Sequence, residues 1–180
     1  NQDNLQRTKS NIDIAFYSNG YQIQGDDGQI NQASGNTYVD WSIRKAPGFF
    51  DVVTYSGNGT ARTIAHSLGC VPGSIWVKSL TEGQSWSVYH RKSNSSPEDY
   101  KLRLDDTNAA FTWNPAWNST LPTSTHFSVG THGSVNSSGN DYIALIFAHD
   151  EQIFGKSGDA SVIKCGSYTI SSGSSTNINL

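Results

Sequence analysis

The chain has 180 residues and a formal net charge of −3, and 15% of its residues are charged. Lysine and arginine are scattered, so the chain lacks the basic patch on which nucleic-acid binding depends. No apolar stretch is long enough to cross a bilayer, and we expect no membrane insertion. Gly, Ser, Thr and Asn are abundant and 11% of the residues are aromatic, a balance that favours strands and turns over helices. We therefore predict an all-β chain.

The N-terminal part of the chain carries patterns that predict three strands. Residues 12–17 and 20–24 are expected to form two short strands. Residues 38–44 alternate between polar and apolar side chains, which predicts a strand with its apolar side chains inward and its polar neighbours facing water.

The middle of the chain predicts a closely spaced series of strands. They cover residues 50–55, 64–66, 74–80, 85–91, 100–105, 111–113, 126–130 and 142–148, and a further strand is expected at 162–168. In residues 100–105 the alternation places Leu102 and Leu104 on the buried face and Lys101 on the opposite face. Residues 142–148 are apolar on both faces, as expected for a central strand. Many short strands with Gly- and Asn-containing turns indicate an antiparallel β-sandwich or jelly roll.

Two N-terminal segments reappear later in the chain. Residues 20–25 resemble residues 126–131, and residues 38–39 resemble residues 142–143. The period is about one hundred residues, which is the size of one small domain. The chain therefore reads as one whole module with parts of neighbouring modules, and we expect it to be a segment of a longer tandem protein.

A fainter repeat indicates where the complete module ends and the next one begins, because residues 162–180 resemble residues 50–69. We predict a complete β-sandwich module at residues 49–150. Residues 1–48 are expected to be the C-terminal part of a preceding module. Residues 151–180 are expected to be a linker and the first strands of a following one.

The patterns of known catalytic sites are missing from the sequence, and we expect neither an enzyme nor a cofactor or metal site. Asp150, Glu151 and Asp159 leave two interpretations open, a calcium site and a solvated linker, and they lack the alternating spacing of a dedicated calcium loop. Cys70 and Cys165 are predicted to be free, packed thiols.

The segment with the clearest capacity to bind a ligand contains two tryptophans around a proline turn. Trp113 and Trp117, with Asn114 and Asn118 beside them, could form an aromatic platform with a polar rim on which a sugar stacks. The alternative is that one or both indole rings close the end of the sandwich.

Several long segments together resemble a known family. They include KAPGFFDVVTYSGNGTARTIAHSLGCVPGSIWVKSL, WSVYHRKS and FSVGTHGSVNSSGNDYIALIFAHD. These segments look like the tandem module of virion fibre and appendage proteins of phages, especially marine and cyanobacterial phages. The motifs that carry the resemblance fall on residues 55–59, 64–72, 75–78, 86–90 and 136–148.

The resemblance implies a non-enzymatic structural module of a phage tail fibre or head appendage, located on the virion and therefore extracellular. It implies self-association, as a homotrimer, and contact with other virion proteins. Attachment to host-surface glycans is a further expectation. The alternative function is a secreted or cell-surface carbohydrate-binding module, in which Trp113 and Trp117 stack on sugar rings.

Overall fold

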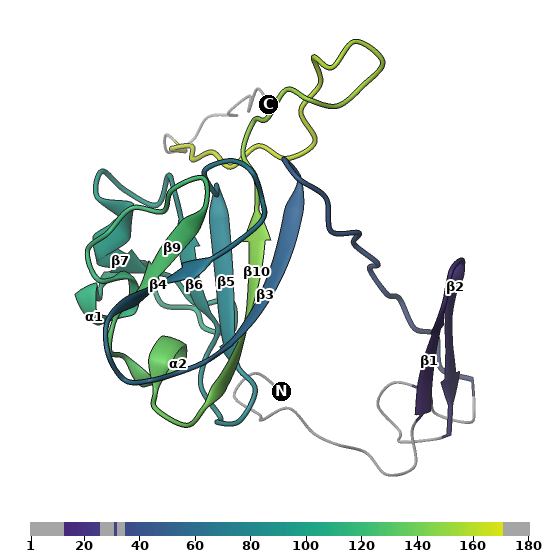
Figure 1. Cartoon of the computed structure of the whole chain (residues 1–180), viewed down its shortest axis with the longest axis horizontal. Coiled ribbons are helices and arrows are strands. Elements are labelled where there is room, and N and C mark those ends of the chain that lie inside the picture. The colour runs from purple at the N-terminus through teal and green to yellow at the C-terminus, as the bar shows by residue number, and fades with distance from the viewer. Residues whose placement is uncertain (1–12, 26–30, 32–34, 171–180) are drawn as a thin grey trace. The chain divides into compact units, whose positions relative to one another are not determined.

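The structure of this chain is a computed structural model that describes residues 13–25, 31 and 35–170. Its regular structure is nearly all antiparallel β-strand, and the helices are short, which confirms the predicted all-β fold class (Figure 1). Contacts divide the described residues into two compact units, and the division falls between Ile43 and Arg44. The first predicted boundary, between residues 48 and 49, lies a few positions further along.

The smaller unit contains a β-hairpin. Strands β1 (Asp13–Tyr17) and β2 (Gly20–Gln24) pair antiparallel along their whole length, as the sequence predicts. Residues 38–44 are extended chain without a paired strand among the described residues, so the prediction of a strand there is wrong. Alternation describes which side chains share a face, but a strand also needs a hydrogen-bonded neighbour.

The larger unit is built on a four-stranded antiparallel sheet. Its strands, in spatial order, are β3 (Phe50–Ser56), β10 (Asp141–Phe147), β5 (Ser74–Ser79) and β6 (Ser87–His90). Strand β10 lies inside the sheet, which confirms the predicted central strand. On its inner face Tyr142, Ala144 and Ile146 are 0% exposed, whereas the side chains that alternate with them are half-buried or exposed.

The first and last strands of this sheet are neighbours. Strands β3 and β10 pair along seven residues, ending with Phe50 opposite Phe147. The ring centroids of these two residues are 5.1 Å apart, and the Ala148 N–H donates a 2.9 Å hydrogen bond to the Phe49 carbonyl. The chain therefore enters and leaves the sheet at the same end.

A smaller second layer covers the inner face of the sheet. It contains the paired strands β4 (Arg62–Ala65) and β9 (His126–Val129) and the one-turn helices α1 (Asn114–Trp117) and α2 (Gly133–Asn136). Apolar side chains of both layers form one continuous core. Its largest fully buried apolar members are Trp117, Tyr142, Phe127, Leu68 and Ile75. The arrangement is a sandwich with one wide and one narrow layer.

A third, minor ladder lies next to α1. It consists of β7 (Tyr100–Lys101) and β8 (Phe111–Thr112), and the 3₁₀ turn η1 (Pro97–Asp99) precedes it. The strand predicted at 100–105 is thus shorter than expected, and its faces are reversed. Lys101 is 1% exposed and Leu104 is 49% exposed. The Lys101 side chain turns inward because its ammonium group donates a hydrogen bond to the buried Ser134 hydroxyl.

The chain beyond β10 contains no strand within its described residues, so the prediction of a strand at 162–168 is wrong. This segment instead folds back on the end of the module. The Asp150 N–H donates to the Ile163 carbonyl at 2.8 Å, and the Cys165 N–H donates to His149 Nδ1 at 2.9 Å. The described residues of the third predicted range therefore pack in the same unit as the central module.

Candidate functional site

The two tryptophans of the predicted glycan site lie in different environments. Trp117 is 2% exposed, and its indole Nε1 donates a 3.0 Å hydrogen bond to the Tyr100 carbonyl. Its ring packs edge-on against Tyr89, with 6.2 Å between centroids. A sugar cannot stack on a ring that the core covers, so the prediction that Trp117 binds a glycan is wrong. Trp117 closes the core, as the alternative interpretation states.

Trp113 lies at the surface and is 37% exposed. Its ring contacts two other rings edge-on, with centroid distances of 5.8 Å to Phe111 and 5.1 Å to His132. Its backbone N–H donates to the Asp99 carbonyl at 2.7 Å. We call Phe111, Trp113 and His132 the aromatic platform. These contacts hold the indole in one orientation and leave more than a third of the residue open to a ligand.

The two predicted asparagines flank this platform in sequence, one at each end of α1. Both are exposed, and the Asn118 N–H donates to the Asn114 carbonyl at 2.9 Å. Asn118 and Ser119 have φ values of 54° and 45°, in the left-handed region that residues with a Cβ seldom occupy. The structure therefore places Trp113, Asn114 and Asn118 at the exposed ends of one short helical turn, whose Trp117 is buried.

A buried polar network lies under the aromatic platform. The Ser134 hydroxyl is 2.7 Å from His132 Nδ1, 2.8 Å from the Ser87 hydroxyl and 3.1 Å from the Lys101 ammonium. The Lys101 ammonium also lies 5.9 Å from the centroid of the Phe111 ring. Ser134 and Ser87 are 1% and 0% exposed. A hydroxyl among basic groups can act as a nucleophile, but a substrate cannot reach this one, and the network supports the platform from below.

Burial, and then the charge of the nearby Arg103 guanidinium, lower the pKa of Lys101 to about 8. The pKa of His132 is also lowered, first by burial and then by the charges of Lys101 and Arg103. Both groups are therefore held toward their neutral forms, which suits a buried site where no described carboxylate forms an ion pair with the lysine.

The lowered pKa of Lys101 predicts a specific dependence of stability on pH. The unfolded lysine holds its proton up to its ordinary pKa of 10.5, whereas the folded one releases it from about 8. The unfolded state therefore binds more protons between these values, and folding becomes more favourable as pH rises. We expect the free energy of unfolding of the wild type, relative to Lys101→Met, to rise by about 2 kcal/mol between roughly pH 7.5 and 9.5.

Urea unfolding of both proteins at several pH values measures this difference. Lys164→Met is the matched control, because that lysine is exposed and the substitution should leave the pH profile unchanged. A wild-type profile parallel to that of Lys101→Met would show that the buried ammonium does not titrate in this range.

One family model matches this chain, over residues 1–169, and its description is "Domain of unknown function (DUF7483)". The chain belongs to the DUF7483 family. The comparisons with curated proteins and with solved structures gave no match. The match covers every described residue of both compact units except Ile170.

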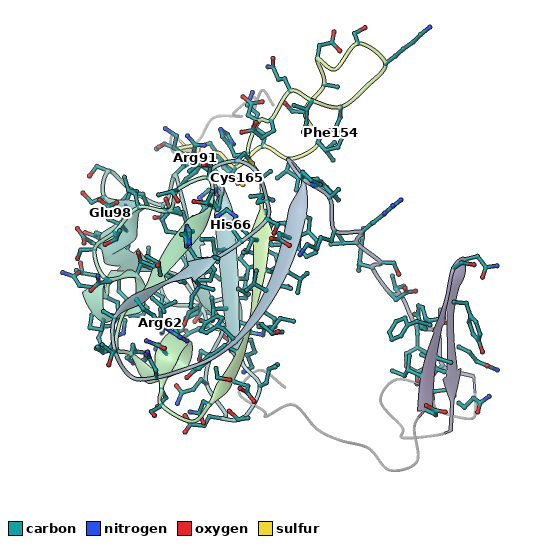
Figure 2. All side chains as sticks on the ribbon, in the orientation of Figure 1. Arg62, His66, Arg91, Glu98, Phe154 and Cys165 are labelled. Atoms are coloured by element: carbon teal, nitrogen blue, oxygen red, sulfur yellow. The ribbon has the colours of Figure 1, made fainter. Side chains whose placement is uncertain are left out.

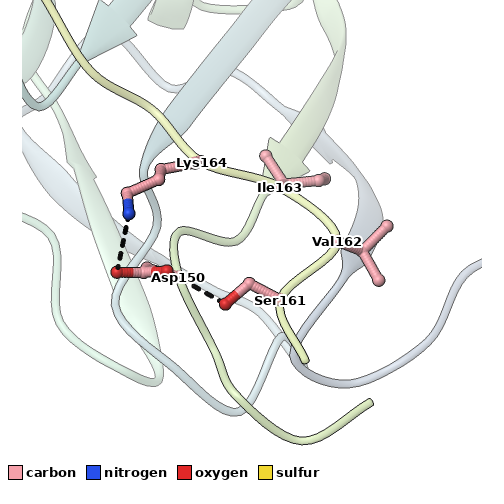
Figure 3. Close-up of a pocket in the computed structure, with 5 residues that line it drawn as sticks. All are labelled: Asp150, Ser161, Val162, Ile163 and Lys164. Carbon is pink, nitrogen blue, oxygen red and sulfur yellow. Dashed lines mark hydrogen bonds and ion pairs between the residues drawn. The ribbon is translucent and has the colours of Figure 1, made fainter. Parts of the chain in front are cut away.

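In the acidic segment of this DUF7483 chain, the Asp150 carboxylate already has two partners among neighbouring side chains. The Asp150 carboxylate accepts a 2.9 Å hydrogen bond from the Ser161 hydroxyl and lies 3.8 Å from the Lys164 ammonium (Figure 3). Among the described residues, no group of three or more His, Cys, Asp and Glu side chains is placed to hold a metal ion. The geometry does not favour the calcium interpretation for Asp150.

The cysteines of the DUF7483 chain are free and buried, which confirms the prediction of packed thiols. Burial raises the pKa of Cys70 to about 11. Burial also raises the pKa of Cys165, whose side chain is labelled in Figure 2. Both are therefore poor nucleophiles at neutral pH. Within the described part of the chain, no helix is long and apolar enough to span a membrane.

The DUF7483 chain also displays large apolar side chains in its smaller unit. In this unit Phe16 is 81% exposed, Val39 82% and Trp41 88%. Every described residue from 13 to 43 is exposed or half-buried, and none is buried. This unit has strands but no core of its own.

Phe111, His132, Lys101 and Ser134 complete the site but were not part of its prediction from sequence. They come from β7, β8 and the start of α2, segments that are far apart in the chain. Phe111 carried a local signal, because it lies two residues before Trp113. The other three become neighbours only where the Ser134 hydroxyl contacts both the Lys101 ammonium and His132 Nδ1, and no local pattern contains the contact between Lys101 and Ser134.

Proposed function

We propose that this DUF7483 chain is a structural segment of a phage virion fibre or appendage, on a tail or a head fibre, whose modules work by associating with one another. The observation that carries the proposal is the smaller unit. It holds paired strands and several large, exposed apolar side chains, yet none of its described residues is buried.

Physical chemistry makes such a unit dependent on a partner. A two-stranded hairpin is at best marginally stable in water, because it buries too little apolar surface to offset the entropy of ordering the chain. An apolar side chain with the exposure of Trp41 is typical of an interaction surface when others lie beside it. Association supplies the missing burial, and the resemblance to virion fibre modules supports a homotrimer as the assembled form.

The repeated sequence also supports a surface role for residues 38–44. The repeat aligns Asp40 and Ser42 with Ala144 and Ile146, which are fully buried in β10. A carboxylate and a hydroxyl at those positions make a poor core strand. The apolar side chains of the segment alternate with them, so it suits a strand that packs one apolar side against a partner.

The proposal predicts that the full chain associates in a concentration-dependent manner. We expect sedimentation velocity to show an oligomer for the wild type, and we expect Val39→Ser combined with Trp41→Ser to shift the distribution to monomer. The double substitution removes two exposed apolar side chains and touches no core residue, so circular dichroism should be unchanged.

Leu121→Ser is the matched control, because Leu121 is 54% exposed on the larger unit. It should sediment as the wild type does. A wild type that is monomeric at every concentration would refute self-association, and loss of the oligomer in the control as well would show that the smaller unit is not the contact.

A further inference from the structure

We propose that the aromatic platform, together with the side chains of Asn114 and Asn118, binds a pyranose ring of a glycan. This inference concerns the larger unit alone and does not depend on the self-association proposed above. It rests on a rigid, partly exposed indole, on exposed amide groups without a hydrogen bond to other described residues, and on a local charge balance that favours a neutral ligand.

The platform is rigid because the chain around Trp113 is tied to the body of the module. The Gly130 N–H donates to the Ala116 carbonyl at 2.8 Å, and the His132 N–H donates to the Pro115 carbonyl at 3.1 Å. A Cβ on Gly130 would lie 2.1 Å from the Pro115 carbonyl oxygen, so the two backbones touch. A preorganised aromatic contact loses little conformational entropy when a ligand binds.

The polar groups beside Trp113 suit sugar hydroxyls. Each asparagine amide offers two N–H donors and a carbonyl acceptor, which matches neighbouring hydroxyl groups that both donate and accept. The side chains of Asn114 and Asn118 are exposed, and the hydrogen bonds found among the described residues involve only their backbone atoms. Asn118 keeps a left-handed φ of 54°, a backbone conformation that the surrounding turn holds.

The charges near the platform argue against an anionic ligand. The Arg103 guanidinium lies 5.3 Å from the centroid of the Phe111 ring, but it already pairs with the Asp106 carboxylate at 2.7 Å. The Lys101 ammonium is buried under the ring and donates to Ser134. A neutral ligand with one apolar face and several hydroxyl groups fits the remaining chemistry, and a pyranose ring has both.

The test uses the full chain on an array of bacterial O-antigen and capsular oligosaccharides, followed by titration of the strongest binder. We expect Trp113→Ala to weaken binding by about tenfold or more, as truncation of a central aromatic contact does. Asn118→Gly should weaken binding by a smaller factor, because glycine keeps the left-handed backbone and removes only the amide.

Tyr168→Ala is the matched control, because Tyr168 is a 61% exposed aromatic residue outside the platform. It should bind as the wild type does, and sedimentation of Trp113→Ala should be unchanged. The inference is overturned if the wild type binds no glycan of the array, if Trp113→Ala keeps its affinity, or if Tyr168→Ala loses affinity to the same extent. None of these results would bear on self-association.

Discussion

Replacing Asn136 with alanine is expected to destabilise the larger unit by about 3 kcal/mol or more. Asn136 is 0% exposed, and its side chain makes three hydrogen bonds to the backbone of two other segments. Its Nδ2 donates to the carbonyls of Thr60 at 2.7 Å and Gly130 at 2.8 Å, and its Oδ1 accepts from the Asn58 N–H at 3.1 Å. Alanine would leave the Gly130 carbonyl without its partner in the interior, and the Thr60 carbonyl and the Asn58 N–H without theirs at partly buried positions.

Urea unfolding followed by tryptophan fluorescence measures the loss. Asn108→Ala is the control, because Asn108 is exposed and its substitution should change the free energy of unfolding by no more than about 0.5 kcal/mol. Asn136→Asp tests the donors separately, since it keeps the acceptor for Asn58 and loses both N–H groups. If Asn136→Ala were as stable as the control, the loop of Asn58 and Thr60 would have to be held by other contacts.

Replacing Trp117 with alanine is expected to cost about 3–5 kcal/mol, the range measured for large aromatic residues removed from a core. Trp117 is 2% exposed, packs edge-on against Tyr89 and loses its hydrogen bond to the Tyr100 carbonyl when the indole is removed. Both layers of the sandwich would border the remaining cavity. Because they are closely packed, they would move only partly into it, and part of the cavity would stay empty.

Trp113→Ala is the natural comparison, because the two tryptophans share a short local sequence and differ in burial. We expect its cost to stay near 1 kcal/mol, since the ring is partly exposed. Trp117→Phe should fall between the two, because it keeps most of the ring volume and removes the indole hydrogen bond. Equal costs for Trp113→Ala and Trp117→Ala would contradict the assignment of one ring to the core and the other to the surface.

Much of the sheet could be predicted because its signal is local. Strand β10 is apolar on both faces, a pattern that predicts a central strand, and it does lie inside the sheet, with one face fully buried and the other partly so. Residues 38–44 show the limit of the same reasoning. Their alternation is as regular as that of any strand in the chain, but it does not specify which other segment, if any, supplies the hydrogen bonds.

The candidate site was predictable only in part, for the same kind of reason. The motif of Trp113 and Trp117 indicated an aromatic cluster, but the turn of α1 decides which ring points inward. The alternation of residues 100–105 predicts that Lys101 lies on the face opposite Leu102 and Leu104. Its ammonium group instead reaches the Ser134 hydroxyl, which arrives from a helix more than thirty residues away in the chain.

The adjacency of Phe50 and Phe147 has a mechanical consequence for any array of such modules. The chain enters through β3 and leaves through β10, and these strands are antiparallel neighbours with their outer ends together. Tension along the polypeptide would therefore pull the pair apart from one end, breaking the backbone ladder one rung after another and not all rungs at once. Because the chain enters and leaves a module at the same end, each module would lie beside the axis along which the tension acts. The connecting segments would transmit that tension.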